Sequence, residues 1–273
     1  MKTLLYILLS LAVLFLLYTF ITMPSLRRHN VFLRMAGKRY GHRGLYGEDA
    51  PENTLSSFSR CIENGFGFEF DVHLTADGEL MIMHDNKTKR MTGRDMKMSE
   101  SDSQTLRELK VGETDEKIPY LSEVLELVAG RFPLIVELKV DGNNYRELCE
   151  KASALLDKYD GDYAIESFDP RPVLWYRLHR PNVARGQLSE NYFKTDYVHS
   201  RIASFLLYNF AGNFITRPDF LAMKISDRGC FTFRLHRFLF PKKTVIWTAG
   251  NERELLECEK EGSSVIFEKF IPR

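Results

Sequence analysis

The sequence predicts a TIM (β/α)8 barrel with a small insertion, preceded by one apolar helix. Apolar runs of strand length alternate with helical patterns through residues 38–273. The runs lie at 38–42, 68–75, 134–138, 163–168, 183–188, 220–225, 244–248 and 264–267. Such alternation, repeated eight times in one domain, is typical of a closed parallel barrel, whose active site lies at the carboxyl ends of the strands.

The run at 68–75 carries an unusual pair of acids. Its side chains alternate, so Glu69 and Asp71 share one face while phenylalanines occupy the other. Two carboxylates so close repel each other unless solvent, a proton or a cation lies between them. Oxygen ligands on one side of a strand suit a hard ion such as Mg²⁺ or Ca²⁺. The plainer alternative is that both acids line the wet face of an edge strand.

Two histidines flank this acidic strand along the chain. His42 ends the first predicted strand and Arg43 follows it, whereas His84 comes directly after the extended run 79–83. A single histidine is usually structural. Two histidines at strand ends around a pair of carboxylates predict a site where protons are transferred.

Four short motifs lie in this part of the chain: His-Arg-Gly at 42–44, Pro-Glu-Asn-Thr at 51–54, Glu-x-Asp at 69–71 and His-Asp at 84–85. In this order and spacing they resemble the glycerophosphodiester phosphodiesterase family, in a membrane-anchored form of bacterial type. The resemblance implies the same barrel, one divalent ion (Mg²⁺ or Ca²⁺), and hydrolysis of glycerophosphodiesters to glycerol 3-phosphate and an alcohol. It also implies that the substrate's own neighbouring hydroxyl attacks, giving a cyclic phosphate that water opens.

The resemblance implies a role for each matching residue. The catalytic residues would be His42 and His84. The metal ligands would be Glu69, Asp71 and Glu137. Phosphate or substrate would contact Arg43, Lys139, Ser167 and Trp247. This set suits the chemistry, because an anionic phosphodiester repels nucleophiles and its cleavage needs cations and positioned proton transfer.

The C-terminal part departs from the family pattern. The strand at 245–248 resembles the family's late tryptophan strand, but Ala249 and Gly250 follow it in place of Val-Asn. The stretch 262–272 stands where the family usually has Gly-Val-Asp-Gly and Thr-Asp-x-Pro. These departures leave the predicted metal and histidine set intact.

Two other segments interrupt the alternation. Residues 86–118 are too many for an ordinary βα loop, and we interpret them as a cap that shapes substrate access, with a floppy surface loop as the alternative. Residues 201–217 are apolar and aromatic at helical spacing. They predict either a helix that covers the core or a helix at a lipid interface. Aromatic side chains that suit such an interface are Tyr192, Phe193, Tyr197 and Tyr208.

Residues 4–23 contain no charged residue, and twenty helical residues span about 30 Å, the thickness of a bilayer core. The run is longer than that of a signal peptide and shows no cleavage site. We therefore expect an uncleaved anchor at 1–26, a basic linker at the membrane surface at 27–37, and the barrel at 38–273. More basic residues follow the helix than precede it, which predicts a single-pass protein of the cell membrane with the barrel in the cytoplasm. Four scattered cysteines agree with a reducing compartment.

The 38 basic and 37 acidic side chains nearly balance, so no nucleic-acid partner is expected. The anchor and the aromatic segment add lysophospholipids to the expected substrates. Three alternatives compete with this function. A phosphatidylinositol-specific phospholipase C uses two histidines on a barrel but not three carboxylates. A metal-dependent sugar isomerase gives no reason for the two histidine motifs. A membrane-tethered lipid-binding or scaffold protein with a catalytically decayed barrel has only the altered C-terminus in its favour.

Overall fold

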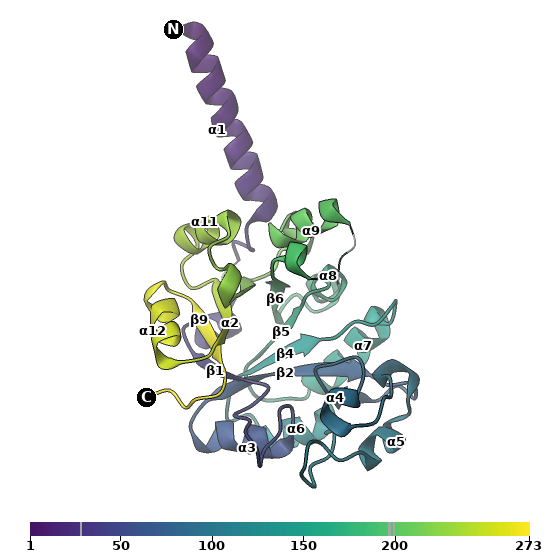
Figure 1. Cartoon of the computed structure of the whole chain (residues 1–273). Helices are drawn as coiled ribbons and strands as arrows, with labels where there is room; N and C mark the ends of the chain where they lie inside the picture. Colours follow the sequence, from purple (N-terminus) through teal and green to yellow (C-terminus); the bar gives the residue numbers. More distant parts are fainter. Residues whose placement is uncertain (28, 196–197, 199) are drawn as a thin grey trace.

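A computed structural model of the chain confirms the closed barrel (Figure 1). It describes residues 1–27, 29–195, 198 and 200–273, so Arg28 and Tyr197 lie outside the described residues. Eight parallel strands pair in sequence, and the last pairs with the first. They are β1 (Arg39–His42), β2 (Gly67–Leu74), β4 (Leu134–Leu138), β5 (Tyr163–Ser167), β6 (Ala184–Ser189), β7 (Phe220–Lys224), β8 (Thr244–Ala249) and β9 (Ser264–Phe267). The short strand β3 (Leu80–Ile82) pairs antiparallel with β2.

Helices follow the barrel strands and cover the outside of the barrel. They are α3 (Leu55–Glu63), α6 (Leu121–Val128), α7 (Tyr145–Leu156), α8 (Pro170–His179), α9 (Arg201–Tyr208), α10 (Asn213–Thr216), α11 (Phe231–Leu239) and α12 (Glu252–Lys260). Short polar side chains set several of their starts. Thr54 accepts a hydrogen bond from the Ser57 amide, Asp169 from the Arg171 amide and Asn251 from the Glu254 amide. Each such cap satisfies a backbone donor that the first helical turn leaves unpaired.

Strand β2 lies inside the sheet. It pairs with β1 on one side and β4 on the other, and all its residues are buried. Phe68, Phe70 and Val72 belong to the core between the strands and the helices. Glu69 and Asp71, on the other face, therefore point into the barrel. The edge-strand interpretation is wrong, because closure of the sheet leaves this strand no wet face.

A short helix closes the amino-terminal end of the barrel. Helix α2 (Asn30–Met35) lies within the predicted linker, and it buries Phe32 and Met35 against the interior side chains of the strands. Phe32 stacks on Phe220 with ring centroids 5.0 Å apart. Phe220 in turn lies across Gly186, where a Cβ atom would come within 2.2 Å of the ring. Helix α2, within the predicted linker, therefore contributes to the barrel floor.

Residues 86–118 fold into a small unit around an apolar cluster that they share with β3 and Met83. The unit contains α4 (Lys89–Thr92), a 3-10 turn η1 (Met98–Glu100) and α5 (Ser103–Glu108). The side chains of the cluster include Met83, Met98, Leu106, Leu109, Val111 and Ile118, all buried. The floppy-loop alternative is wrong, since the segment is held by a packed apolar cluster that it shares with β3 and Met83. Its role as a cap over the substrate stays a prediction.

Helix α1 (Lys2–Thr22) projects from the barrel domain (Figure 1). It is long and apolar enough to cross a membrane, and its most apolar stretch is not buried by the rest of the chain. A signal sequence has the same features, so length and composition alone do not separate the two. The four cysteines are free and buried.

The barrel floor predicts a difference between two neighbouring positions on α2. Phe32→Ala should lower the free energy of unfolding by about 3–5 kcal/mol, because it removes a buried ring and leaves a cavity against Phe220. Leu33→Ala, on the exposed side of the same helix, should change it by about 0.5 kcal/mol or less. Denaturant titration of the full chain in detergent measures both. Equal losses would show that α2 does not close the barrel.

Candidate active site

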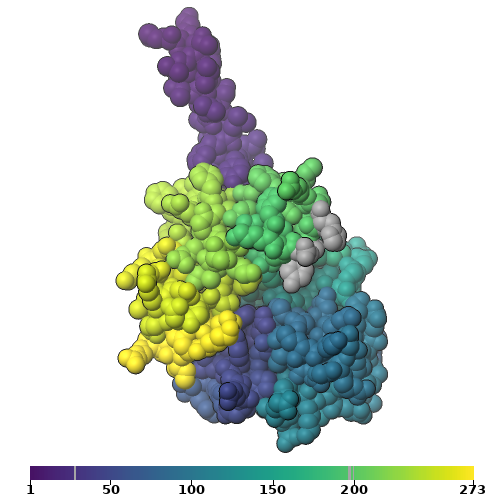
Figure 2. Space-filling model, viewed as in Figure 1, coloured from purple at the N-terminus to yellow at the C-terminus, as the bar shows by residue number. Residues whose placement is uncertain are grey.

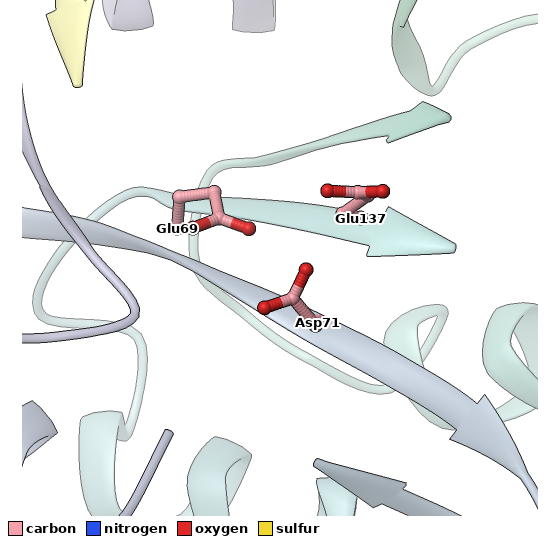
Figure 3. Close-up of side chains that lie close together, drawn as sticks. All are labelled: Glu69, Asp71 and Glu137. Carbon is pink, nitrogen blue, oxygen red and sulfur yellow. The ribbon is translucent and has the colours of Figure 1, made fainter. Parts of the chain in front are cut away.

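The register of the parallel strands brings the acids together. Asp71 of β2 is the partner of Glu137 of β4, and Glu137 is the partner of Glu166 of β5, so three acids form a row across three strands. Glu69 lies two residues before Asp71 and is the partner of His42 in β1. Figure 3 shows Glu69, Asp71 and Glu137 converging from β2 and β4. One carboxylate oxygen from each lies within 4.8 Å of the others.

The carboxylates of this cluster are buried and lie close enough together to repel one another. Burial and the neighbouring carboxylates raise the pKa of Glu69 and of Glu166 well above the ordinary value. Burial also acts on Asp71, but the positive charges of Lys139 and Arg43 outweigh it and hold that pKa well below its ordinary value. The Lys139 Nζ lies 2.9 Å from Asp71 Oδ1 and 2.6 Å from Glu137 Oε1. One buried lysine therefore compensates part of the acidic charge.

The remaining charge fits a divalent cation. Four carboxylates are buried beside two basic side chains, Lys139 and Arg43. Glu69 Oε1 and Glu166 Oε2 are buried and have no hydrogen-bond donor within the described part of the chain. Buried charges of this kind need a partner, and oxygen donors suit Mg²⁺ or Ca²⁺. Glu69, Asp71 and Glu137 fit the ligand set that the sequence predicts.

His42 is held by an acid that the sequence analysis missed. Its Nδ1 lies 2.7 Å from Glu268 Oε2, and its Nε2 lies 4.0 Å from Glu69 Oε2. Burial lowers the pKa of His42, and Glu268 only partly opposes this shift. Glu268 also accepts a hydrogen bond of 2.9 Å from the Tyr46 hydroxyl. Glu268 follows β9, which pairs with β1, so closure of the barrel carries it beside the histidine.

His84 has a carboxylate partner as well. Its Nδ1 lies 2.6 Å from Asp85 Oδ1. Arg90 of α4 donates to the other oxygen of Asp85 at 2.6 Å and to Glu52 at 2.6 Å. Arg43 donates to the same Glu52 oxygen at 2.8 Å. Residues 86–118 are thus joined to both histidine motifs by ion pairs.

Further residues position this machinery. Asn53, from the Pro-Glu-Asn-Thr motif, donates through Nδ2 to Asp71 Oδ2 at 2.8 Å, which fixes the orientation of that carboxylate. His73 lies on the same face of β2, with Nε2 3.3 Å from the His84 carbonyl oxygen. Burial lowers the pKa of His73 to about 4, so it stays neutral. Neither role is readable from spacing alone, although Asn53 lies in a motif that the sequence singles out.

A cavity of about 810 Å³ opens over these residues. All the predicted site residues except Asp71 line this cavity. They are His42, Arg43, Glu69, His84, Glu137, Lys139, Ser167 and Trp247. The Ser167 hydroxyl donates to the Leu138 carbonyl oxygen at 2.8 Å, so this side chain lies in the wall with its proton already engaged. The aromatic rings of Phe168 and Trp247 meet edge to face at 5.5 Å. The cavity is therefore lined by charged and apolar groups together, with the Lys139 Nζ 6.0 Å from the centre of the Phe168 ring.

Comparison with known proteins agrees with this geometry. The family model for the glycerophosphoryl diester phosphodiesterase family matches residues 42–221, which include His42, His84 and all three predicted metal ligands. The chain belongs to this family. The match ends before Trp247 and Glu268, in the part of the sequence that departs from the family pattern.

Two proteins named as phosphodiesterases or phospholipases of this kind match part of this chain. A glycerophosphodiester phosphodiesterase of Bacillus altitudinis is 38% identical over 119 residues, which are 40% of this chain and 47% of that protein. The human lysophospholipase D GDPD1 is 29% identical over 153 residues, 51% of this chain and 47% of that protein. The chain thus matches about half the length of each of these relatives.

Solved structures share the fold. A phosphodiesterase of Oleispira antarctica, in complex with the product sn-glycerol-3-phosphate, has a TM-score of 0.71 at 22% identity and covers 87% of this chain and 94% of its own. A glycerophosphodiester phosphodiesterase of Thermotoga maritima has a TM-score of 0.64 at 26% identity, with 84% and 93% covered.

The pair formed by His42 and Glu268 predicts an acid-dependent loss of stability. Burial would raise the pKa of Glu268, but the hydrogen bond from His42 outweighs it and lowers the pKa to about 2, from an ordinary 4.5. The stabilisation is therefore complete above pH 4.5 and is lost as the pH falls towards 2. Glu268→Gln should lower the free energy of unfolding by about 1–3 kcal/mol near neutral pH, and this difference should shrink in acid. Denaturant titration across pH, with the exposed Glu48→Gln as control, measures it. A gap that does not change with pH would contradict the assigned pair.

Proposed function

We propose that this chain hydrolyses glycerophosphodiesters to glycerol 3-phosphate and an alcohol. The observation that carries the proposal is one cavity in which two histidines, each paired with a carboxylate, face a buried cluster of acids. Membership of the family supports it, as does the product in the complex of the Oleispira antarctica enzyme. A decayed scaffold is the other candidate, and the complete set of histidines and acids speaks against it.

The two histidines divide the proton transfers. Each imidazole donates through Nδ1 to a carboxylate, which leaves Nε2 to exchange a proton with the substrate. One Nε2 accepts the proton of the attacking hydroxyl while the other protonates the oxygen of the leaving alcohol. The new bond from phosphorus to the substrate's own hydroxyl closes a cyclic phosphate. Water then opens it, with the proton transfers reversed.

The charged side chains bind the anionic phosphate. Arg43 and Lys139 line the cavity next to both histidines, and a guanidinium can hold two phosphate oxygens at once. A divalent ion, Mg²⁺ or Ca²⁺, held by Glu69, Asp71 and Glu137 would polarise a phosphoryl oxygen. Ser167 and Trp247 contribute to the wall that orients the alcohol part of the substrate.

Lysophospholipids are part of the proposed substrate class. The cavity has an apolar wall of Leu188, Tyr192, Phe168 and Trp247, which an acylated substrate can cover. Relatives named lysophospholipase D support this extension, and helix α1 would keep the site near lipid.

Phosphorus NMR tests the function. The full chain in detergent, supplied with Mg²⁺ or Ca²⁺, should convert glycerophosphocholine and a lysophospholipid to phosphomonoesters, and a chelator should stop it. His42→Ala and His84→Ala should each lower turnover by about 10²–10⁴-fold, because each removes a positioned proton donor or acceptor. A folded chain that turns over neither substrate under any of these conditions would support the lipid-binding or scaffold alternative.

Metal binding can be tested without activity. Mg²⁺ or Ca²⁺ should raise the thermal midpoint of the unsubstituted chain, because a ligand of the folded state stabilises that state. Glu137→Ala should abolish both this rise and metal-dependent turnover while circular dichroism shows an intact fold. Glu126→Ala, at an exposed position on α6, serves as the control and should keep both. A Glu137→Ala chain that still responds to metal would remove Glu137 from the ligand set.

The chain is proposed to be a single-pass protein of the cell membrane with its barrel in the cytoplasm. The basic residues that follow α1 support this orientation. Protease added to intact cells should therefore leave the barrel uncut, whereas permeabilised cells should lose it. Removal of the barrel from intact cells would overturn the orientation.

A further inference from the structure

Eight large apolar side chains project into solvent from three helices around the foot of α1. They are Ile202, Phe205 and Leu206 of α9, Phe214 and Ile215 of α10, and Phe231, Phe238 and Leu239 of α11. Phe238 is 83% exposed and Ile202 is 75% exposed. Figure 2 shows the green lobe of α9 and α10 and the lime lobe of α11 on either side of the base of α1. We call these eight side chains the apolar collar. An exposed apolar surface of this kind marks a place of interaction.

The foot of α1 is fixed to the helices of the collar. The Tyr18 hydroxyl shares a hydrogen bond with Thr232 of α11. The Thr22 hydroxyl lies 2.7 Å from His236 Nε2, also on α11, and Asn213 of α10 donates to the Thr22 carbonyl oxygen at 2.8 Å. These contacts hold both ends of the last turn of α1. The helix is therefore a rigid extension of the domain and not a flexible tether.

The length of α1 then decides where the bilayer lies. Residues 2–17 are exposed, and Tyr18 is the first residue of the helix to be partly covered by the domain. Sixteen helical residues span about 24 Å, whereas a bilayer core is about 30 Å thick. A membrane-spanning α1 must therefore bring residues 18–22 to the edge of the hydrocarbon layer. Because these residues are fixed to α10 and α11, the side chains of the collar must then lie in the headgroup region as well.

The charges of the segments that carry the collar also favour contact with a lipid bilayer. Residues 200–218 and 228–243 contain seven arginines and lysines and no aspartate or glutamate. The seven are Arg201, Arg217, Arg228, Arg234, Arg237, Lys242 and Lys243. Two of them, Arg228 and Arg237, form ion pairs with Glu257 and Glu261 of α12, so five remain whose charge no ion pair within the described residues balances. The rest of the chain is acidic by comparison, since the whole carries a net charge of only +1. Basic side chains beside apolar ones are the composition that binds anionic lipid headgroups.

We propose that the apolar collar is a second membrane-binding surface, which seats the barrel directly on an anionic lipid bilayer. The collar enters the headgroup layer around α1, so the domain has a fixed height and orientation on the membrane. This surface does not depend on the catalytic activity of the site.

Spin labels on the full chain in vesicles of phosphatidylcholine and phosphatidylglycerol test this. Single substitutions Phe205→Cys and Phe238→Cys place a label on the collar. Leu256→Cys, at an exposed leucine of α12, is the matched control outside the collar, and Leu9→Cys reports the middle of α1. Since the four native cysteines are buried, the unsubstituted chain gives the labelling background. Collisions with oxygen, which concentrates in lipid, and with a water-soluble nickel chelate are measured for each label.

Both collar labels should collide with the nickel chelate several-fold less often than the Leu256→Cys label, and more often with oxygen. The Leu9→Cys label should be the best protected from the chelate. Collar labels as open to the chelate as the control would overturn the proposal, because the domain would then hang in water. A water-accessible Leu9→Cys label would overturn it too, since α1 would not cross the bilayer.

Discussion

Closure of the barrel through β1 and β9 is the constraint on which the site depends. Arg39, Tyr40 and Gly41 pair with Val265, Ile266 and Phe267, which completes the ring of parallel strands. This single seam places Glu268 against His42, although 226 residues separate them along the chain. Closing the ring also encloses the face of β2 that carries Glu69 and Asp71, a strand that already lies between β1 and β4. An open sheet with the same strands would have neither the paired histidine nor the buried acids.

The interior of the barrel divides into an apolar half and a charged half. Tyr40, Ile135, Ala164 and Phe220 occupy the amino-terminal half above α2. Two residues further along β4 and β5, Glu137 follows Ile135 and Glu166 follows Ala164, and Asp71 of β2 is the partner of Glu137. Apolar packing in one half supports a charge cluster in the other, whose repulsion would otherwise oppose folding. Lys139, Arg43 and Asn53 reduce that repulsion but leave carboxylate oxygens without a partner. The carboxylates of the site are thus only partly compensated by the positive charges of the protein, and a bound cation would supply the positive charge that is missing.

Sequence patterns predicted the strands well, because the patterns that mark strands and helices depend only on residues close together in the chain. Each strand and the helix after it can therefore be recognised without knowledge of the rest of the chain. The same patterns gave His42, His84 and the three acids, since short motifs mark them. Glu268, the place of Glu166 among the acids, and α2 were missed for a physical reason. Glu268 acts only because β9 meets β1, and Glu166 joins the acids only through register with Glu137. Helix α2 lies in a segment whose basic composition predicts a linker. Only the stacking of Phe32 on Phe220 shows that the helix belongs to the barrel. Contacts between distant segments decide all three, and local spacing does not contain them.

The proposed seating of the barrel on the membrane would give a physical reason for the proposed lipid substrate. Tyr192 lines the cavity, and α9, which carries part of the collar, begins nine residues later in the sequence at Arg201. A barrel seated by its collar would keep that wall close to the lipid surface. A lysophospholipid could then present its phosphodiester to the histidines while its acyl chain stays near apolar surroundings throughout. A soluble diester gains nothing from such an arrangement, because it reaches the cavity through water. On the proposed seating of the barrel, substrates that are held in the membrane themselves would therefore be favoured.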